Sequence, residues 1–357
     1  MTVAILPGDG IGPEVTAAGL AVLRAVRPEL TYEHGLVGAA ALDSYGSPYP
    51  SQTAALCRRS AAILFGAVGD PRYDGARGEL RPEVAILRLR KEFDLFANLR
   101  PVKTIAGLEA ASSLRPEVVR GLDLIVVRET TSGLYFGTPK QTTFEDGIEV
   151  AVDTLVYRAP EVERVAQVAF ALARERRGRV TSVDKHNVLE TGRLWRRIVT
   201  QVATQYPDVA LDHLLVDNAA MQLVRDPKRF DVILTENTFG DILSDQAGML
   251  TGSLGNLPSA TLGAQAPGTT GPRFGLYEPI SGSAPDIAGK GIANPIAAIL
   301  SAALLCRYSL ADETSAARIE SAVTAAVALG ARTRDLVRDD APFLGTSAFT
   351  ERVLARL

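Results

Sequence analysis

The chain of 357 residues is long enough for two domains, or for one large α/β body with an inserted part. Its hydrophobic content of 46% and charged content of 22% are those of an ordinary soluble globular protein. The formal net charge is −3, and no dense Lys/Arg cluster carries interleaved aromatic residues, so nucleic acid and anionic membrane are excluded as expected partners.

The N-terminus is expected to form a first strand and not a signal peptide. It has no basic region, and only residues 3–6 are apolar before a turn begins. The longest later apolar run, residues 296–306, is well short of the about twenty residues that span a bilayer. Cys57 and Cys306 lie far apart in apolar surroundings, which predicts core thiols and a reducing, cytoplasmic location.

The first elements predict a parallel sheet with helical crossovers. A strand over residues 3–6 leads through a turn with Gly8, Gly10 and Gly12 into a helix that ends near residue 26. The glycine spacing is G-x-G-x-G and not the G-x-G-x-x-G of dinucleotide-binding turns, so a tight turn and a ligand loop remain equally open. A helix near 52–59 precedes a buried strand at 61–68.

The remaining elements continue this alternation as far as the C-terminus. The expected helices cover residues 82–93, 160–177, 188–206, 218–224, 237–250, 294–305 and 313–329, with a last one from 346. The expected strands cover residues 122–127, 180–183, 209–216 and 232–234. Residues 134–157 predict a protruding hairpin, and residues 252–272 and 278–286, rich in small residues, predict surface loops.

Ionisable residues follow several of these strands: Arg128, Asp184 with Lys185, Asp217, and, after a short loop, Asp241. Asp241 and Asp245 lie four residues apart on one helical face. Considered alone, that pair is more typical of a solvated helix face than of a metal site. Together, however, arginines and aspartates at the carboxyl edge of a sheet fit a small polycarboxylate chelated to Mg²⁺ or Mn²⁺.

Seven ordered segments closely resemble the 3-isopropylmalate dehydrogenases, of the decarboxylating β-hydroxyacid dehydrogenase family that includes isocitrate and homoisocitrate dehydrogenases. The resemblance runs nearly end to end, and seven segments in order are far more specific than any one of them. The segments are LPGDGIGPEV at 6–15, LRLRKEFDLFANLRP at 87–101, VRETTSGLYFG at 127–137, SVDKHNVLE at 182–190, VDNAAMQLV at 216–224, FGDILSD at 239–245 and GSAPDIAGKGIANP at 282–295.

The resemblance implies a fold of two α/β domains with a large mixed sheet, which is not the Rossmann fold. The first domain would take residues 1–96 plus 252–357 and most of the NAD site. The second would take residues 97–251, with the metal site and the dimer contact. A homodimer with shared active sites is implied, and the arm near 134–157 would clasp the other subunit.

The resemblance also assigns the polar site residues. Arg90, Arg100 and Arg128 would hold the malate carboxylates, and Asp217, Asp241 and Asp245 would bind Mg²⁺ or Mn²⁺. Lys185 would be the base for the C2 hydroxyl, acting in its neutral form, and Tyr135 the acid that protonates the enolate carbon. Lys185 and Asp217 would reach the site from the partner subunit. The alternative roles are a surface lysine at a strand end and a tyrosine that anchors the hairpin.

The implied cofactor is NAD, bound by residues of both glycine-rich segments: Ile11, Gly282, Ser283, Ala284, Asp286 and Asn294. Asp286 would accept hydrogen bonds from the adenosine ribose, and a carboxylate there would repel the 2′-phosphate of NADP. Asn294 would contact the adenine.

The wall that would face the C3 substituent consists of Glu83, Ile86, Leu87 and Val188. An apolar wall suits an alkyl group and hence 3-isopropylmalate, whose oxidation and decarboxylation to 4-methyl-2-oxopentanoate belongs to leucine biosynthesis. A methylene changes discrimination by only ~1–3 kcal/mol, so a relative acting on another 3-alkyl- or 3-arylalkylmalate is the alternative. A catalytically silent regulatory homologue is the second alternative.

Some positions depart from the family pattern. They are Ala85-Ile86, Thr131-Ser132, His186, Glu236, Ser281 and extra residues around 264–273. For His186 the expected place is behind the site or on the surface, and not in the chemistry.

Overall fold

The computed structural model describes residues 1–264, 272–339 and 341–357. Contacts among the Cα atoms divide the chain into two compact units. The first comprises Met1–Leu95, Lys103–Gly121 and Gly248–Leu357, and the second comprises Phe96–Val102 and Leu122–Ala247. Residues 103–121, which the sequence interpretation gave to the second domain, thus group with the first unit. The assignment of NAD to one domain and metal to the other stays a prediction.

The first unit contains five strands in the order β2-β1-β3-β12-β11. Neighbouring strands run parallel except β11 and β12, which are antiparallel, so this part of the sheet is mixed as expected. The strands are β1 (Thr2–Gly8), β2 (Thr31–His34), β3 (Ala62–Ala67), β11 (Pro258–Leu262) and β12 (Gly275–Pro279). The helices are α1 (Gly12–Val26), α2 (Ala39–Tyr45), α3 (Ser51–Arg59), α4 (Val84–Glu92), α5 (Pro116–Val119), α10 (Ile296–Ser309), α11 (Glu313–Ala328) and α12 (Thr346–Leu354).

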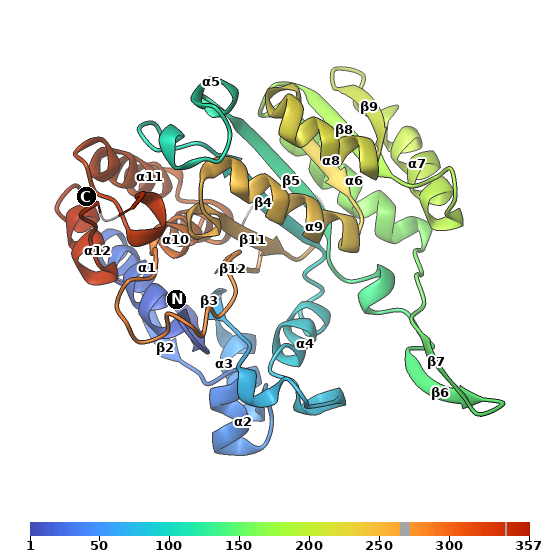
Figure 1. The fold of residues 1–357 in the computed structure, drawn as a ribbon, viewed down its shortest axis with the longest axis horizontal. Helices are drawn as coiled ribbons and strands as arrows, with labels where there is room; N and C mark the ends of the chain where they lie inside the picture. Colours follow the sequence, from blue (N-terminus) through green and yellow to red (C-terminus); the bar gives the residue numbers. More distant parts are fainter. Residues whose placement is uncertain (265–271, 340) are drawn as a thin grey trace. The chain divides into compact units, whose positions relative to one another are not determined.

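Alternating apolar residues explain how helices cover this part of the sheet. Ala4 and Leu6 of β1, with Ile63 and Phe65 of β3, lie in one buried cluster that includes residues of α3 and α4. Because successive strand residues point to opposite faces, the intervening residues face the other side. Figure 1 shows α1 and α10 together in this unit, and both contact β3.

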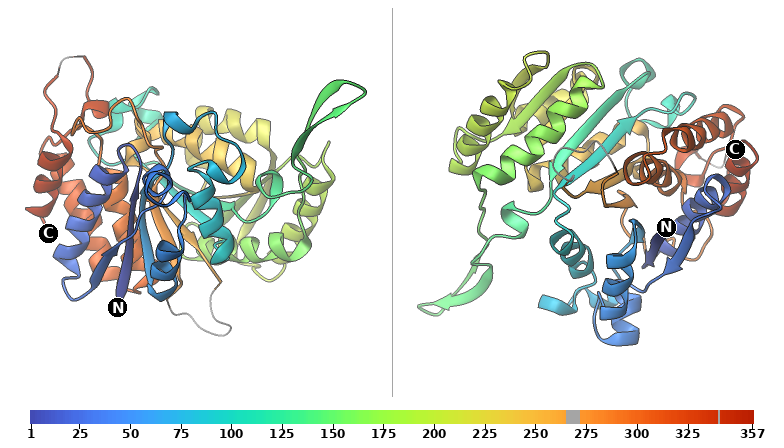
Figure 2. Two further views of the ribbon diagram at one scale, coloured as in Figure 1. Left: turned by 90° about the horizontal axis from the view of Figure 1, so that it is seen from below. Right: turned by 180° about the vertical axis from the view of Figure 1, so that it is seen from behind.

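The second unit contains strands in the order β4-β5-β10-β8-β9, and a separate antiparallel pair, β6 and β7. The strands are β4 (Ala97–Lys103), β5 (Asp123–Glu129), β6 (Gln141–Glu145), β7 (Ile148–Val152), β8 (Arg179–Asp184), β9 (Ala210–Leu215) and β10 (Val232–Thr235). The helices are α6 (Ala159–Arg174), α7 (Glu190–Ala203), α8 (Val216–Arg225) and α9 (Asn237–Gly248). Figures 1 and 2 show α6 and α7 on one face of this sheet and α8 and α9 on the other.

The register of the parallel strands brings their charged ends to one edge. Thr235 at the end of β10 pairs with Arg128 of β5 on one side and with Val183 of β8 on the other. Asp184 in turn pairs with Leu215, directly before α8 begins. The strand-end residues predicted to meet therefore do lie along one edge of the second unit's sheet.

The hairpin expected within residues 134–157 is present. β6 and β7 pair from Gln141↔Val152 to Glu145↔Ile148, and the hairpin extends away from the other strands of its unit (Figure 1). Phe144 and Ile148 of the hairpin are large apolar residues that are 70% and 67% exposed.

One loop expectation is wrong and another lies partly outside the described residues. Residues 258–262 of the expected loop 252–272 form the fully buried strand β11. The local sequence does not predict this strand, because it is stabilised by hydrogen bonds to another segment, β12. Residues 265–271, within the proposed insertion at 264–273, lie outside the described part of the chain.

The first residues of the expected loop 278–286 end β12. Both cysteines are buried free thiols, as predicted. No helix in the described ranges has the length and apolarity needed to cross a membrane.

Candidate active site

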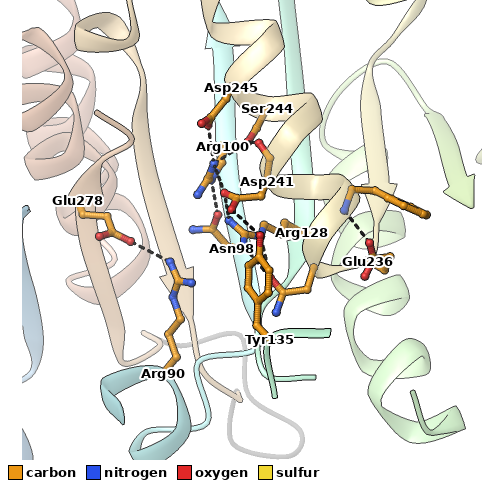
Figure 3. Close-up of polar contacts among 12 residues, drawn as sticks. Arg90, Asn98, Arg100, Arg128, Tyr135, Glu236, Asp241, Ser244, Asp245 and Glu278 are labelled. Atoms are coloured by element: carbon orange, nitrogen blue, oxygen red, sulfur yellow. Dashed lines mark hydrogen bonds and ion pairs between the residues drawn. The ribbon is translucent and has the colours of Figure 1, made fainter. Parts of the chain in front are cut away.

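Arg128 is the buried centre of a polar cluster in the second unit (Figure 3). Its side chain is 2% exposed, and its Nε and Nη2 donate to Asn237 Oδ1 at 3.1 and 2.7 Å. Its Nη1 forms an ion pair with Asp241 Oδ1. Since a buried guanidinium needs its donors satisfied, the first turns of α9 fix both the place and the orientation of this cation.

Arg100, on β4, contacts the next turn of the same helix. Its Nη1 donates to Ser244 Oγ at 2.6 Å and lies 3.2 Å from Asp245 Oδ1 and 3.4 Å from Asp241 Oδ1. Its Nε donates to Asn98 Oδ1 at 2.7 Å. The prediction that Asp241 and Asp245 share a helical face is confirmed, and two arginines offset the repulsion between them.

Gly240 lets α9 approach Arg128 this closely. A Cβ added at Gly240 would lie 2.6 Å from Cγ and 2.9 Å from Cβ of Arg128. Any side chain at that position would displace either the arginine or the helix.

Tyr135 lies beside the same carboxylate. It ends a short 3₁₀ turn after β5, and its hydroxyl donates to Asp241 Oδ2 at 3.1 Å. Burial, with the charge of Asp241, raises the pKa of Tyr135, while Arg128 opposes that shift. The phenol therefore holds its proton more tightly than an ordinary tyrosine does.

The two aspartates could hold a hard divalent cation only in part. Burial, with repulsion by Asp241, raises the pKa of Asp245, and Arg100 opposes the shift. A cation would favour the charged forms and accept carboxylate oxygens, the ligands that Mg²⁺ and Mn²⁺ prefer. Over the described ranges no group of three or more His, Cys, Asp or Glu residues is placed to hold a metal. The pair fits such an ion, but it needs further ligands.

Lys185 and Asp217 form a second pair in this unit. Lys185 follows β8, Asp217 lies in the first turn of α8, and Nζ is 2.9 Å from Asp217 Oδ1. The hydrogen bond from Lys185 lowers the pKa of Asp217. Asp217 is not grouped with Asp241 and Asp245 among the described residues of this chain.

Behind Arg128 lies a hydrogen-bond network that the sequence does not predict, although one of its members, Glu236, departs from the family pattern. The Tyr157 hydroxyl lies 3.2 Å from Glu236 Oε2 and 3.4 Å from Glu129 Oε2, and it accepts from the backbone N–H of Asn237 at 2.9 Å. Burial raises the pKa of both Glu129 and Glu236. The network holds Asn237, which in turn orients Arg128. The available signal was an acidic residue at the end of each buried strand: Glu129 is the last residue of β5, and Glu236 directly follows β10.

His186 stands beside the site and not in it. Its Nδ1 lies 2.8 Å from Oδ1 of the buried Asp184, whose Oδ2 accepts from Arg196 Nε at 2.9 Å. This placement agrees with the expectation of a supporting or surface histidine.

In the first unit, Arg90 is a buried cation in the last turn of α4. Its Nη2 lies 3.3 Å from Glu278 Oε1, as Figure 3 shows, and its buried Nε has no acceptor among the described residues. On the same helix Ile86 and Leu87 are half-buried, and Glu83, directly before it, is exposed. Val188, in the second unit, is 65% exposed. The apolar wall for a C3 substituent stays a prediction.

The glycine-rich turn and the loop predicted to bind NAD lie against each other in the first unit. Ile11 N–H donates to the Ser283 carbonyl at 2.8 Å, and a Cβ added at Gly10 would lie 1.9 Å from that oxygen. Ala284 has φ of 40°, and a Cβ at Gly282 would meet no atom within 4 Å. Because Gly282 has no side chain, a ligand can approach its backbone closely, as a bound cofactor would.

Asp286 and Asn294 differ in their availability. Asp286 is exposed, so its carboxylate is accessible to ribose hydroxyls. The Asn294 amide donates to Asn256 Oδ1 at 3.0 Å and Asp335 Oδ2 at 2.9 Å, and its Oδ1 accepts from Ile296 N–H at 3.0 Å. The amide group and the Oδ1 of Asn294 thus already have hydrogen-bond partners within the chain. An adenine contact at this position would therefore be made by the backbone.

The chain matches known proteins over nearly its whole length. The family model described as isocitrate/isopropylmalate dehydrogenase matches residues 2–353. A protein named 3-isopropylmalate dehydrogenase from Geobacillus kaustophilus is 53% identical, over 98% of this chain and 94% of its own. One of the same name from Albidiferax ferrireducens is 55% identical, over 94% of each chain.

Solved structures agree in fold. A crystal structure of isocitrate dehydrogenase from Methylococcus capsulatus has a TM-score of 0.88 at 34% identity, over 99% of this chain and 98% of its own. A β-decarboxylating dehydrogenase from Thermococcus kodakarensis in its apo form has a TM-score of 0.77 at 36% identity, over 99% of this chain and 95% of its own. The α/β fold with a mixed sheet, predicted from the resemblance, is thereby confirmed.

Proposed function

Since the chain belongs to the isocitrate/isopropylmalate dehydrogenase family, we propose that it oxidises and decarboxylates 3-isopropylmalate to 4-methyl-2-oxopentanoate with NAD and Mg²⁺ or Mn²⁺. The observation that carries the proposal is the cluster in which Arg100 and Arg128 meet Asp241 and Asp245 on α9. It places fixed cations and hard oxygen ligands together, as a dicarboxylate chelated to a divalent cation requires.

The divalent cation and NAD have separate chemical tasks. When bound, the divalent cation polarises the substrate oxygens and NAD accepts the hydride from C2. Asp241 and Asp245 would hold the cation, with Asp217 of the partner subunit as a third ligand. The backbone at Gly282–Ala284, together with Ile11 and Asp286, would hold NAD.

The chain's own side chains bind the substrate and move its protons. Arg128 and Arg100, oriented by Asn237 and Asn98, would hold the malate carboxylates, with Arg90 as a third cation. Lys185 would take the proton of the C2 hydroxyl. Tyr135, whose pKa is raised by burial and by Asp241, keeps a proton to give to the carbon that loses CO₂.

We further propose a cytoplasmic homodimer that serves leucine biosynthesis. Its support is the exposed apolar hairpin together with the Lys185–Asp217 pair, which this chain does not group with its own Asp241 and Asp245. A partner that supplies Lys185 and Asp217 would complete both the metal and the base functions.

The deciding experiment compares steady-state kcat/KM for NAD reduction with a panel of substrates. The panel is 3-isopropylmalate, 3-methylmalate, 3-benzylmalate, isocitrate and homoisocitrate, each with Mg²⁺ and with Mn²⁺. We expect the highest kcat/KM for 3-isopropylmalate, and lower values with NADP in place of NAD.

A higher kcat/KM for any other substrate would overturn the assignment of the C3 substituent and leave the chemistry intact. Failure to reduce NAD with every substrate after Mn²⁺ is restored would overturn the enzymatic proposal itself. The silent regulatory homologue would then be favoured.

A further inference from the structure

A cavity of about 450 Å³ lies in the first unit, among residues of the C-terminal third of the chain. It is formed by the end of α11, the chain after it, residues 342–344 and α12. None of the residues assigned above to substrate, metal or NAD lines it. Its volume is within the range of small-molecule sites, about 300–1,000 Å³.

Three arginines line the cavity, and its described lining contains no carboxylate: Arg332, Arg352 and Arg356. Within the described ranges, the Arg332 guanidinium donates to three carbonyls, those of Val327 at 2.7 Å, Ala331 at 2.8 Å and Gly107 at 2.7 Å, and to no carboxylate. Burial lowers the pKa of Arg332, and the attraction of Glu109 opposes that shift. The positive charge of Arg332 is therefore hydrogen-bonded to carbonyl oxygens but is not paired with a carboxylate among the described residues.

Arg356 is also a cation without an ion-pair partner among the described residues. Its Nη1 donates to the Arg352 carbonyl, and its buried Nε has no acceptor in the described part of the chain. Like charges that line one concave site repel each other, and an anion relieves the repulsion of all of them at once.

Large apolar side chains complete the lining. Leu329 is 72% exposed and Phe343 is 43% exposed, and both line the cavity with Leu344. Exposed large apolar residues that gather at one hollow are typical of a binding site, whereas scattered ones are ordinary. Charge and apolar surface together describe a ligand with an anionic head and an apolar body.

We propose that this cavity is a second ligand site, which binds a small carboxylate with a short alkyl or aryl body. The carboxylate contacts Arg352 and Arg356, whose planar guanidinium groups suit its two oxygens. The apolar body contacts Leu329 and Phe343. A compact hollow of this volume favours a small molecule over a protein partner, which would need a broader surface.

The test is isothermal titration of the full-length protein with 4-methylpentanoate, in the absence of NAD, metal and malate. We expect wild type to bind with a millimolar dissociation constant and the double variant R352Q/R356Q to bind at least about tenfold more weakly. Arg318→Gln is the matched control. It removes the same charge from a residue of α11 that donates to the Leu357 carbonyl at 2.9 Å and does not line this cavity.

Phe343→Ser separates the apolar contact from the charge. It should weaken 4-methylpentanoate and leave the binding of inorganic sulfate unchanged. Wild-type affinity in R352Q/R356Q, equal weakening in Arg318→Gln, or no binding to wild type would overturn the proposal. Equal binding of sulfate and 4-methylpentanoate would overturn it as well, because the site would then be one for inorganic anions. The binding measurement is independent of catalysis, so it stands or fails separately from the proposed reaction.

Discussion

Lys185 directly follows β8, and its Nζ lies 2.9 Å from Asp217 Oδ1. If it is the base, Lys185→Ala should lower kcat by about 10²–10⁴-fold, the usual contribution of general base catalysis. Binding of 3-isopropylmalate should change little, because Arg100 and Arg128 remain in place. Steady-state kinetics with NAD and Mn²⁺ would measure both effects.

The control for this variant is Lys228→Ala, which removes an equal charge from an exposed position of the same unit. It should retain wild-type kcat. If Lys185→Ala also retained wild-type kcat, the base would have to be another group.

Glu236 gives the stability of the protein a pH dependence. Burial raises its pKa above the ordinary value of 4.5, although the backbone N–H of Phe239 and the Tyr157 hydroxyl oppose the shift. A raised pKa means that the folded chain holds a proton which the unfolded chain has released. The contribution of Glu236 to the free energy of unfolding is thus present below about pH 4.5 and declines as pH rises toward the folded-state pKa.

Glu236→Gln should remove this decline while keeping the shape of the side chain. Its amide oxygen can still accept from Phe239 N–H, and its NH₂ can donate to Tyr157. The free energy of unfolding of wild type minus that of the variant should fall with pH, by at most about 1.4 kcal/mol per unit. Urea unfolding at intervals from pH 5 to 8 measures it, and a difference independent of pH would contradict the assignment.

Helix α9 is the element on which the site is built. Asn237, Asp241, Ser244 and Asp245 project from one side of it toward the arginines of β4 and β5. Gly240 lies on the same side, where only a hydrogen fits against Arg128. Glycine has poor helix propensity, but at this position it allows the helix to pack closely against the buried guanidinium of Arg128.

Gly240→Ala separates helix propensity from site geometry. Alanine favours a helix by roughly 1 kcal/mol, but its Cβ would lie 2.6 Å from Arg128 Cγ. We expect retained helix content by circular dichroism, a loss of kcat/KM of at least about tenfold, and a lower melting temperature. Gly75→Ala is the control, because a Cβ there would meet no atom within 4 Å. Unchanged kcat/KM would show that Arg128 can shift away from the added methyl group without loss of activity.

The elements differ in how far the sequence predicts them. β5 and β10 contain short apolar runs, β8 contains the β-branched residues Val180, Thr181 and Val183, and each strand was predicted close to its observed position. β11, with the sequence PSATL, has no apolar run and lies in a stretch rich in small residues. Its strand conformation comes from pairing with β12, which is contact with another segment and leaves no local pattern.

The contacts between site residues also differ in whether the sequence predicts them. The meeting of Arg128 with Asp241 could be expected, because parallel strands align their carboxyl ends. The roles of Asn98, Tyr157 and Ser244 could not, since amides and hydroxyls occur throughout the chain and their partners depend on side-chain direction.

At the scale of the whole molecule, the proposed homodimer would have to cover large apolar side chains that are exposed in the second unit. Val188 is 65% exposed, Met221 and Ile242 are each 61% exposed, and Phe144 on the hairpin is 70% exposed. Burial of such side chains is one of the contributions that stabilise a protein interface. If that interface is the proposed twofold one, each site combines residues of two chains.

Shared sites predict that two inactive variants restore activity when their subunits are mixed. In the proposed dimer, Lys185→Ala inactivates the site of the partner subunit, because that site takes its lysine from the variant chain. Asp241→Asn inactivates the site of its own subunit. A mixed dimer therefore contains one site with both defects and one with neither. Random exchange makes about half of the dimers mixed, so activity should rise to about a quarter of wild type.

Mixing after denaturation and refolding, followed by NAD reduction with 3-isopropylmalate, measures this recovery. Each variant refolded alone is the control and should stay inactive. Recovery requires that Lys185 and Asp241 act across the subunit boundary. An inactive mixture that nevertheless contains mixed dimers, detected through a mass tag on one variant, would place both residues in the same chain's site.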